Sequence, residues 1–399
     1  MRIHRTLLEY AVAIFQRICN IPKTNSFFLF GARGTGKTSL LHDQFSAEKI
    51  LWIDLLDRRL EDRYALSPNL LYDELKVANY SWVVIDEIQK IPKLLDTVHR
   101  IIESREFEPP KFALTGSSAR KLRHGGANLL AGRAFIRNLY PLTFRELNDE
   151  FDLTTALTFG SLPKIFSLHT VDDRNDFLTS YGLTYLKEEV WAEHLVRDLD
   201  PFRKFIEIAA QCNGKTVNYA NIARDVNAHE KTVKNYFEIL EDTLLGFFLE
   251  PYSASLRKRQ HKSPKFYLFD PGVKRALDRT LTQPLLPSTS AYGQAFEHFI
   301  IAECVQLNDY GRKDFKLSYF LTKDGGEIDL VVERPGRPTA FIEIKSAVKT
   351  DERDTRYLRS VVSELDNAEA FCLSQDPHER IEDGVAHLHW VKGLREVGF

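Results

Sequence analysis

A short apolar run near the start of the chain leads directly into a glycine-rich loop. The run FFLF at residues 27–30 predicts a buried strand, and a helical pattern follows over residues 39–45. Between them, residues 31–38 read GARGTGKT and match the pattern GxxxxGK[ST] in its required context of strand, loop and helix. An incidental lysine in a glycine-rich turn would not need both flanking elements. This order of elements is typical of an α/β fold built on a parallel sheet.

The chemistry of this loop predicts a site for ATP and Mg²⁺. Glycines let the backbone wrap closely around phosphates, and loop N–H groups at the positive end of a helix donate hydrogen bonds to phosphate oxygens. We expect Lys37 to neutralise the β- and γ-phosphates and the Thr38 hydroxyl to ligate Mg²⁺. The predicted nucleotide-binding residues are Gly31, Ala32, Arg33, Gly34, Thr35, Gly36, Lys37, Thr38 and Ser39.

A second apolar run, WVVI at residues 82–85, ends in two acidic residues. It predicts a central parallel strand whose carboxyl end reaches the phosphate loop. We expect Asp86 to hold Mg²⁺, usually through a water molecule bound to the ion. We expect Glu87 to polarise a second water, the one that attacks the γ-phosphate. A strand that ends in a solvated acidic turn is the alternative, and the nearby phosphate loop disfavours it.

A third strand is predicted over residues 111–116, followed by two serines. Ser117 or Ser118 would sense the γ-phosphate, and the pattern does not choose between them. Either serine would also suit the cap of a helix that begins at Ala119, and the two roles are compatible.

Four segments together resemble a bacterial and archaeal AAA+ ATPase family whose members usually carry a C-terminal domain of unknown function. They are GARGTGKT (31–38), IDEIQK (85–90), LTGSS (114–118) and YPLTFREL (140–147). The resemblance implies an arginine finger that reaches the nucleotide of a neighbouring subunit, and hence a homo-oligomer, which we expect to be a hexamer. Arg133 is the first candidate and Arg120 its rival. A surface arginine at the end of a helix is the alternative reading of Arg133.

Breaks in the pattern divide the chain into a P-loop AAA+ core (1–150), a helical lid (151–200), a winged helix-turn-helix (201–285) and a C-terminal domain (286–399). In the third piece, helices are predicted over residues 216–226 and 231–240, with a strand or wing after Thr243. The second helix would present four side chains that suit phosphates and base edges: Lys231, Thr232, Lys234 and Asn235. Winged helices also serve as protein-docking modules, so this alternative stays open.

A basic strip follows the predicted wing. Residues 257–265, RKRQHKSPK, contain no acidic residue. Such a strip would contact phosphates and make DNA binding depend on salt, although a solvated charged loop would look the same.

The C-terminal piece predicts the order α-β-β-β-α-β, from a helix over 292–305 to a strand over 368–374. Because side chains alternate along a strand, Glu343 and Lys345 share a face, and Asp329 and the helix residue Glu297 would join them. These carboxylates would bind Mg²⁺ or Mn²⁺, while Lys345 would orient or activate water. The pattern resembles the PD-(D/E)XK nuclease fold, a restriction-endonuclease-like α/β domain, with isoleucine in place of the usual proline before Asp329. An inactive domain with the same charges in a salt-bridge cluster is the alternative.

Composition restricts the remaining possibilities. Of 399 residues, 43% are hydrophobic and 28% charged, the balance of a folded globular chain, and the formal net charge of −2 attracts neither nucleic acid nor acidic membranes as a whole. The four cysteines form no paired motif. No apolar stretch is long enough to cross a bilayer. We therefore expect a cytoplasmic protein with no membrane partner.

The sequence thus predicts an oligomeric ATPase that acts on DNA, branched or junction DNA by analogy with ring-forming motors. Two other functions remain open. One is a nucleotide-controlled switch or scaffold in signalling or defence, with a protein partner. The other is a metal-dependent DNA nuclease that ATP gates.

Overall fold

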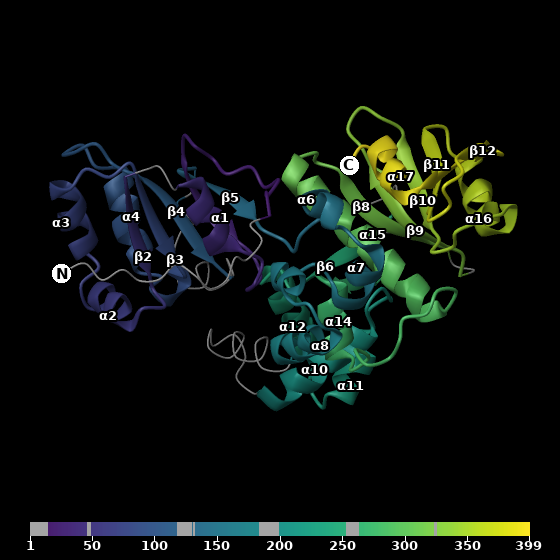
Figure 1. The fold of residues 1–399 in the computed structure, drawn as a ribbon, viewed down its shortest axis with the longest axis horizontal. Coiled ribbons are helices and arrows are strands. Elements are labelled where there is room, and N and C mark those ends of the chain that lie inside the picture. Colours follow the sequence, from purple (N-terminus) through teal and green to yellow (C-terminus); the bar gives the residue numbers. More distant parts are fainter. Residues whose placement is uncertain are drawn as a thin grey trace.

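The computed structural model describes residues 15–45, 49–117, 130, 132–182, 199–252, 263–322 and 325–399. Three groups of elements follow one another along the chain (Figure 1). A small parallel sheet with its helices comes first, a group of helices follows, and a large mixed sheet closes the chain. Among the described residues, no helix combines the length and the apolar character needed to span a membrane.

The first sheet has five parallel strands in the order β2-β3-β4-β1-β5. The sheet is fully buried along β1 and β3. The parallel sheet predicted from the sequence is therefore confirmed. β2 was not predicted. The bounds are β1 (Ser26–Phe30), α1 (Lys37–Gln44), β2 (Ile50–Asp54), α2 (Arg58–Leu66), α3 (Leu70–Val77), β3 (Trp82–Asp86), α4 (Leu94–Ile102), β4 (Lys111–Gly116) and β5 (Ala134–Asn138).

The helices of the middle group that follow Phe144–Leu147 share one apolar core, whose residues run from Phe159 to Leu277 and which also includes Ala32 of the phosphate loop. Phe144 packs instead in the core of the C-terminal sheet. The first helix of the expected helix-turn-helix begins at Tyr219 and not at Thr216, because the Asn218 side chain caps it with a 3.0 Å hydrogen bond from the Asn221 N–H. The bounds are α6 (Phe144–Leu147), α7 (Leu153–Phe159), α8 (Val171–Ser180), α10 (Leu199–Gln211), α11 (Tyr219–Asp225), α12 (Glu230–Asp242) and α14 (Pro271–Leu277).

The second sheet has eight strands in the order β12-β13-β11-β10-β9-β8-β6-β7. Its last two strands come from the middle of the chain. β6 pairs parallel with β8, which removes the exposed edge that β8 would otherwise have. The bounds are β6 (Gly246–Pro251), β7 (Lys265–Leu268), α15 (Ser290–Gly311), β8 (Lys316–Leu321), β9 (Glu327–Glu333), β10 (Thr339–Ile344), α16 (Glu352–Val362), β11 (Ala368–Ser374), β12 (Arg380–Glu382), β13 (Val385–His389) and α17 (Trp390–Val397).

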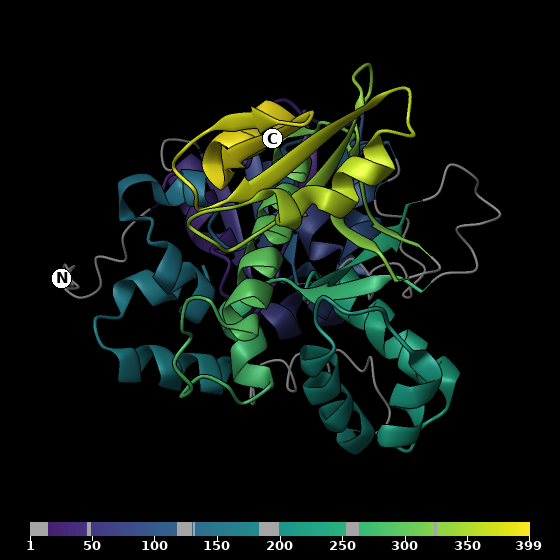
Figure 2. The same cartoon turned by 90° about the vertical axis from the view of Figure 1, so that its right-hand side faces the viewer.

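Helices cover both faces of this sheet. α15 and α17 share one apolar core with it, and α16 belongs to a second core on the other face. In Figure 2, α15 runs as a long green helix between the yellow C-terminal strands and the teal helices. The predicted order from α15 to β11 agrees with the structure, but β12, β13 and α17 were not predicted.

Candidate functional site

The loop between β1 and α1 depends on its glycines. Gly34 and Gly36 have φ angles of 75° and 94°, which are left-handed values that favour glycine. A Cβ atom added to Gly31 would lie 2.4 Å from the Leu139 carbonyl oxygen. The loop therefore keeps close to the chain that follows β5, and side chains at these positions would distort it.

The residues predicted to hold phosphate and Mg²⁺ lie together at the carboxyl edge of the sheet. Lys37 is buried, and its Nζ donates to the Gly31 carbonyl at 2.7 Å and lies 3.3 Å from that of Ala32. The Thr38 hydroxyl donates to Asp86 Oδ2 at 2.8 Å. The hydroxyl and carboxylate are hard oxygen ligands, and Mg²⁺ commonly keeps most of its waters beside one or two protein groups. Thr38 and Asp86 therefore fit this ion.

The remaining loop residues frame this site. Thr35 is buried and its hydroxyl donates to the Ala32 carbonyl at 2.7 Å, while Ser39 lies exposed in the first turn of α1. The Tyr181 hydroxyl, after α8, donates to the Arg33 carbonyl at 2.9 Å. A residue of the predicted lid thus contacts the loop directly.

Glu87 stands in a restricted backbone conformation next to Asp86. Its φ of 60° is left-handed, which costs a residue with a Cβ roughly 1 kcal/mol. The Glu87 N–H donates to the Thr115 hydroxyl at 3.2 Å, and that hydroxyl donates to Asp86 Oδ1. Thr115 therefore fixes both acidic residues relative to β4.

Gln89 joins two of the predicted catalytic residues, although no role was predicted for it. Its side-chain amide donates to Glu87 Oε2 and, at 3.2 Å, to Ser117 Oγ. Gln89 and Ser117 are 3% and 1% exposed. In the sequence, only the position of Gln89 two residues after Glu87 could have indicated this role. Ser118, the rival sensor, lies outside the described residues.

Arg133 lies far from the phosphate loop of its own chain. It directly precedes β5, whose first residue pairs with Ser26 at the start of β1, whereas the loop follows the end of β1. Its guanidinium pairs with Glu103 and lowers the pKa of that carboxyl. A finger at this place would have to serve a neighbouring copy. Arg120 lies outside the described residues.

The surface of α12 offers part of the predicted DNA contact. Lys231 and Lys234 are exposed, and Thr232 and Asn235 are half-buried. Lys234 is paired with Glu230 at 2.7 Å on the same helix, so only part of its charge is available to a phosphate.

The basic strip differs from the prediction at Lys265. Residues 257–262 lie outside the described residues. Lys265 is only 3% exposed, and its Nζ contacts Glu327 and lies 3.4 Å from Glu297. It therefore belongs to an acidic cluster and not to a solvent-facing strip, because β7 pairs with β6 and so joins the C-terminal sheet.

The C-terminal residues singled out in the sequence converge on this acidic cluster. Lys345 Nζ donates to Glu343 Oε1 at 2.6 Å, and the Ile344 N–H donates to Asp329 Oδ2 at 2.7 Å. Glu297 accepts a 2.7 Å hydrogen bond from the Tyr267 hydroxyl. Lys265 and Glu327 also belong to this group, although neither was predicted to. We call this group the acidic cluster; its members are Lys265, Glu297, Glu327, Asp329, Glu343 and Lys345.

Burial and mutual repulsion dominate the electrostatics of the acidic cluster. Burial, and then the carboxylates of Glu343 and Glu297, raise the pKa of Asp329 well above its usual range. Burial opposes the charge on Lys265, but Glu297 and Glu327 outweigh it and raise the pKa of the lysine. Within the described ranges, no three His, Cys, Asp or Glu side chains are placed to hold a metal ion. Lys265 and Lys345 balance the charge of these carboxylates.

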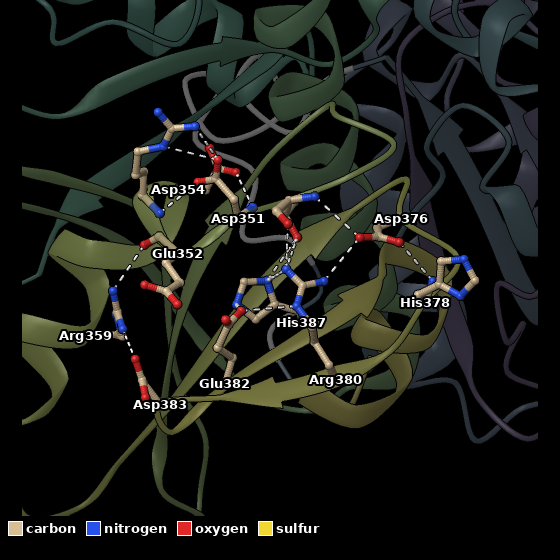
Figure 3. Close-up of polar contacts among 12 residues, drawn as sticks. Asp351, Glu352, Asp354, Arg359, Asp376, His378, Arg380, Glu382, Asp383 and His387 are labelled. Carbon is tan, nitrogen blue, oxygen red and sulfur yellow. Dashed lines mark hydrogen bonds and ion pairs between the residues drawn. The ribbon is translucent and has the colours of Figure 1, made fainter.

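A second polar cluster lies at the β12 end of the same sheet (Figure 3). Arg380 donates to the Thr350 carbonyl at 2.7 Å and to Asp376 at 3.2 Å, and it lies 3.2 Å from His387 Nδ1. Burial, and then Arg380, lower the pKa of His387. These contacts tie the loops after β10 and β11 to β13, which is a structural task.

Three family models match successive parts of the chain. Residues 23–148 match an AAA domain, residues 150–283 a domain of unknown function (DUF8612), and residues 292–390 a domain of unknown function (DUF4143). The first match supports an AAA+ ATPase domain with nucleotide binding and ATPase activity in general.

Similar proteins come from bacteria and archaea. An uncharacterized protein of Mycobacterium tuberculosis is 28% identical over 283 residues, which cover 71% of this chain and 62% of that protein. One from Methanocaldococcus jannaschii is 25% identical over 394 residues, which cover 85% of this chain and 79% of that protein. The match thus spans less than two thirds of the mycobacterial relative.

Solved structures give a weaker likeness. The Thermotoga maritima RuvB Holliday junction branch migration motor has a TM-score of 0.29 and 19% identity, with 59% of this chain and 86% of that chain covered. The replication initiator DnaA bound to AMPPCP and single-stranded DNA has a TM-score of 0.25 and 15% identity, with 54% and 82% covered. Scores this low support no inference about function.

Proposed function

We propose that this chain couples ATP hydrolysis at the loop of residues 31–38 to the binding and remodelling of DNA, of branched or junction DNA in particular. The observation that carries the hydrolytic part of the proposal is the contact between Thr38 and Asp86, with Glu87 next in the chain. In this proposal the hydroxyl and the carboxylate of these two residues would hold Mg²⁺, and Glu87 would orient the attacking water. The AAA domain over residues 23–148 supports the hydrolytic step.

Each residue of the site has one task in this proposal. Lys37 binds the β- and γ-phosphates, and its exchange from loop carbonyls to phosphate oxygens keeps its hydrogen bonds satisfied. Thr38 and Asp86 hold Mg²⁺, which when bound neutralises charge on the phosphates. Glu87 orients the attacking water and accepts its proton.

Gln89 orients the Glu87 side chain and links it to Ser117. The amide of Gln89 holds one Glu87 oxygen and contacts Ser117, so a change at the γ-phosphate sensor reaches the water-orienting carboxylate through one side chain.

Arg133 completes the site of a neighbouring copy, and the active form is therefore a homo-oligomer, which we propose to be a hexamer.

DNA binding in this proposal uses the exposed side of α12. Three helices (α10, α11 and α12) followed by the β6–β7 hairpin give the order of a winged helix. Lys231 and Lys234 would bind phosphates, and replacing either lysine with alanine would lower the salt dependence of DNA binding by about one unit of the logarithmic slope.

The test is the ATPase rate with and without four-way junction DNA and linear duplex at low salt. Junction DNA should raise the wild-type rate, and the double variant Lys231→Ala/Lys234→Ala should lose most of this stimulation. The matched control is Lys76→Ala/Lys392→Ala, in exposed lysines of α3 and α17. A wild-type rate that no DNA changes would favour the alternative of a nucleotide-controlled switch with a protein partner.

A second candidate function is metal-dependent cleavage of DNA by the C-terminal part. The convergence of Asp329, Glu343 and Lys345 favours it. The described residues do not form a metal ligand set, so we assign no catalytic step to this cluster. Cleavage of plasmid DNA with Mg²⁺ or Mn²⁺, abolished in Asp329→Ala, would support this function. Intact DNA with both metals would exclude it.

A further inference from the structure

Arg17, which precedes β1, donates a hydrogen bond to the backbone of the phosphate loop. Arg17 Nη1 donates to the Thr35 carbonyl at 2.6 Å, and Nη2 donates to the Tyr140 carbonyl at 2.7 Å. Nε pairs with Glu146 at 2.8 Å, and the two side chains are 6% and 0% exposed. One planar guanidinium thus joins the loop to the segment that follows β5.

The same arginine contacts the C-terminal part of the chain. Its Nη2 lies 3.1 Å from the hydroxyl of Tyr310, near the end of α15, and that hydroxyl also accepts the Tyr140 N–H at 2.9 Å. The rings of Tyr140 and Tyr310 pack edge to face at 5.6 Å. A residue of α15 therefore helps to fix the position of Arg17.

A hydrogen bond to the Thr35 carbonyl fixes the orientation of the peptide between Thr35 and Gly36. In a trans peptide, the carbonyl and the following N–H point in opposite directions. A hydrogen bond from Arg17 to this carbonyl therefore turns the Gly36 N–H away from Arg17. Gly36 has a left-handed φ of 94° and, like Gly34, little intrinsic preference for one conformation, so the loop gains order from the contact.

Helix α15 connects this contact to the acidic cluster. Glu297 lies on the same helix as Tyr310, about 20 Å away along its axis. Phe144, at the start of α6, reinforces the docking, because its N–H donates to Glu303 of α15 at 2.9 Å. The helix is one continuous element of 22 residues, so its position affects both ends.

We propose that Arg17 is a positioning residue for the phosphate loop and that Tyr310 makes its hold depend on the docking of α15. The docked C-terminal part then raises the affinity of the loop for nucleotide. By thermodynamic linkage, bound nucleotide strengthens the docking by the same factor. This inference rests on the proposed nucleotide site.

The test separates nucleotide affinity from catalysis. Tyr310→Phe removes the hydroxyl and keeps the ring. We expect the KM for ATP and the Kd of a fluorescent ATP analogue to rise about 5- to 10-fold, with kcat within about twofold. This is less than the roughly 10- to 150-fold of a direct hydrogen bond to a charged group, because the hydroxyl acts on the loop through Arg17. Tyr292→Phe is the matched control on the same helix, because its hydroxyl accepts a 3.3 Å hydrogen bond from the Gln375 amide and lies far from Arg17 along the helix.

Arg17→Lys is the second variant, since a lysine keeps the charge but replaces the planar fork with a single ammonium group. It should weaken nucleotide binding at least as much as Tyr310→Phe. Two results together would overturn this inference and leave the proposed function intact: both variants bind nucleotide as tightly as the wild type does, and the wild type hydrolyses ATP. A wild-type chain that binds no ATP would overturn both.

Discussion

The hydroxyl of Thr38 donates a 2.8 Å hydrogen bond to the carboxylate of Asp86, although the two residues lie 48 positions apart in the chain. Parallel pairing of β1 with β4 and of β4 with β3 brings the carboxyl ends of these strands to one edge of the sheet. Side chains that follow the strands therefore meet there. This relationship turns two separate sequence motifs into one candidate site.

Lys37→Met should remove nucleotide binding while the fold is kept. Methionine has a similar length, but it cannot neutralise phosphate charge. We expect the Kd of a fluorescent ATP analogue to rise at least about 100-fold, since two phosphates are deprived of a charge-assisted hydrogen bond. Lys23→Met, in an exposed lysine before β1, is the control and should bind as the wild type does. Equal affinity in both variants would remove Lys37 from the site.

Gln89→Met should slow hydrolysis with little effect on ATP binding. The variant keeps the size of the buried side chain but cannot form the hydrogen bonds to Glu87 and Ser117. Removal of one hydrogen bond to a charged group predicts a roughly 10-fold fall in kcat. Steady-state kinetics measure it. A rise in KM at constant kcat would show that Gln89 serves binding and not the orientation of Glu87.

Glu303→Gln should stabilise the protein above neutral pH. Burial raises the pKa of Glu303 from its ordinary value of 4.5 to about 8, so the folded chain holds a proton that the unfolded chain releases. Stability therefore falls as pH rises from about 4.5 to about 8. An amide needs no proton and still accepts the Phe144 N–H.

The measurement is the difference in Tm between Glu303→Gln and the wild type at pH 5 and at pH 8. We expect the Tm difference to be larger at pH 8 than at pH 5. The corresponding difference in unfolding free energy should grow by on the order of 1–4 kcal/mol between the two pH values. Glu364→Gln, in an exposed residue after α16, is the control. The same difference at both pH values would contradict the assigned proton.

Lys265→Met should destabilise the chain, because it leaves Glu297 and Glu327 without their buried cation. The loss should be smaller than the roughly 3–5 kcal/mol of a fully buried ion pair, because the side chains of Glu297 and Glu327 are 22% and 38% exposed. Thermal unfolding with and without Mg²⁺ or Mn²⁺ then examines the acidic cluster. Recovery of Tm by either ion in the variant alone would show that the carboxylates accept a metal when the lysine is gone. No recovery would assign the cluster to ion pairing alone.

Much of the fold followed from local patterns. The strands at residues 82–86 and 111–116 are apolar runs that end in functional side chains, and they lie where the sequence predicted them. β2 was missed because it is an edge strand with a single fully buried residue, Ile53, and so gives no clear apolar pattern.

The partners of the site could not be read from the sequence. Arg17, Gln89 and Lys265 take their roles from contacts across the fold: Arg17 meets Tyr310, and Lys265 meets Glu297 through the β6–β7 hairpin. Lys265 looked like part of a solvated basic strip, since its neighbours in sequence are basic. Only the pairing of β7 with β6 places it beside carboxylates.

The central claim is that this chain hydrolyses ATP with Glu87 as the residue that orients water. The most direct measurement compares the ATPase rate of the wild type with that of Glu87→Gln, with nucleotide affinity and Tm measured on the same samples. We predict a rate at least about 100-fold lower, with affinity and Tm retained, because an amide cannot accept the proton of the water. A variant that hydrolyses ATP at the wild-type rate, or a wild type with no ATPase activity at all, would contradict the account.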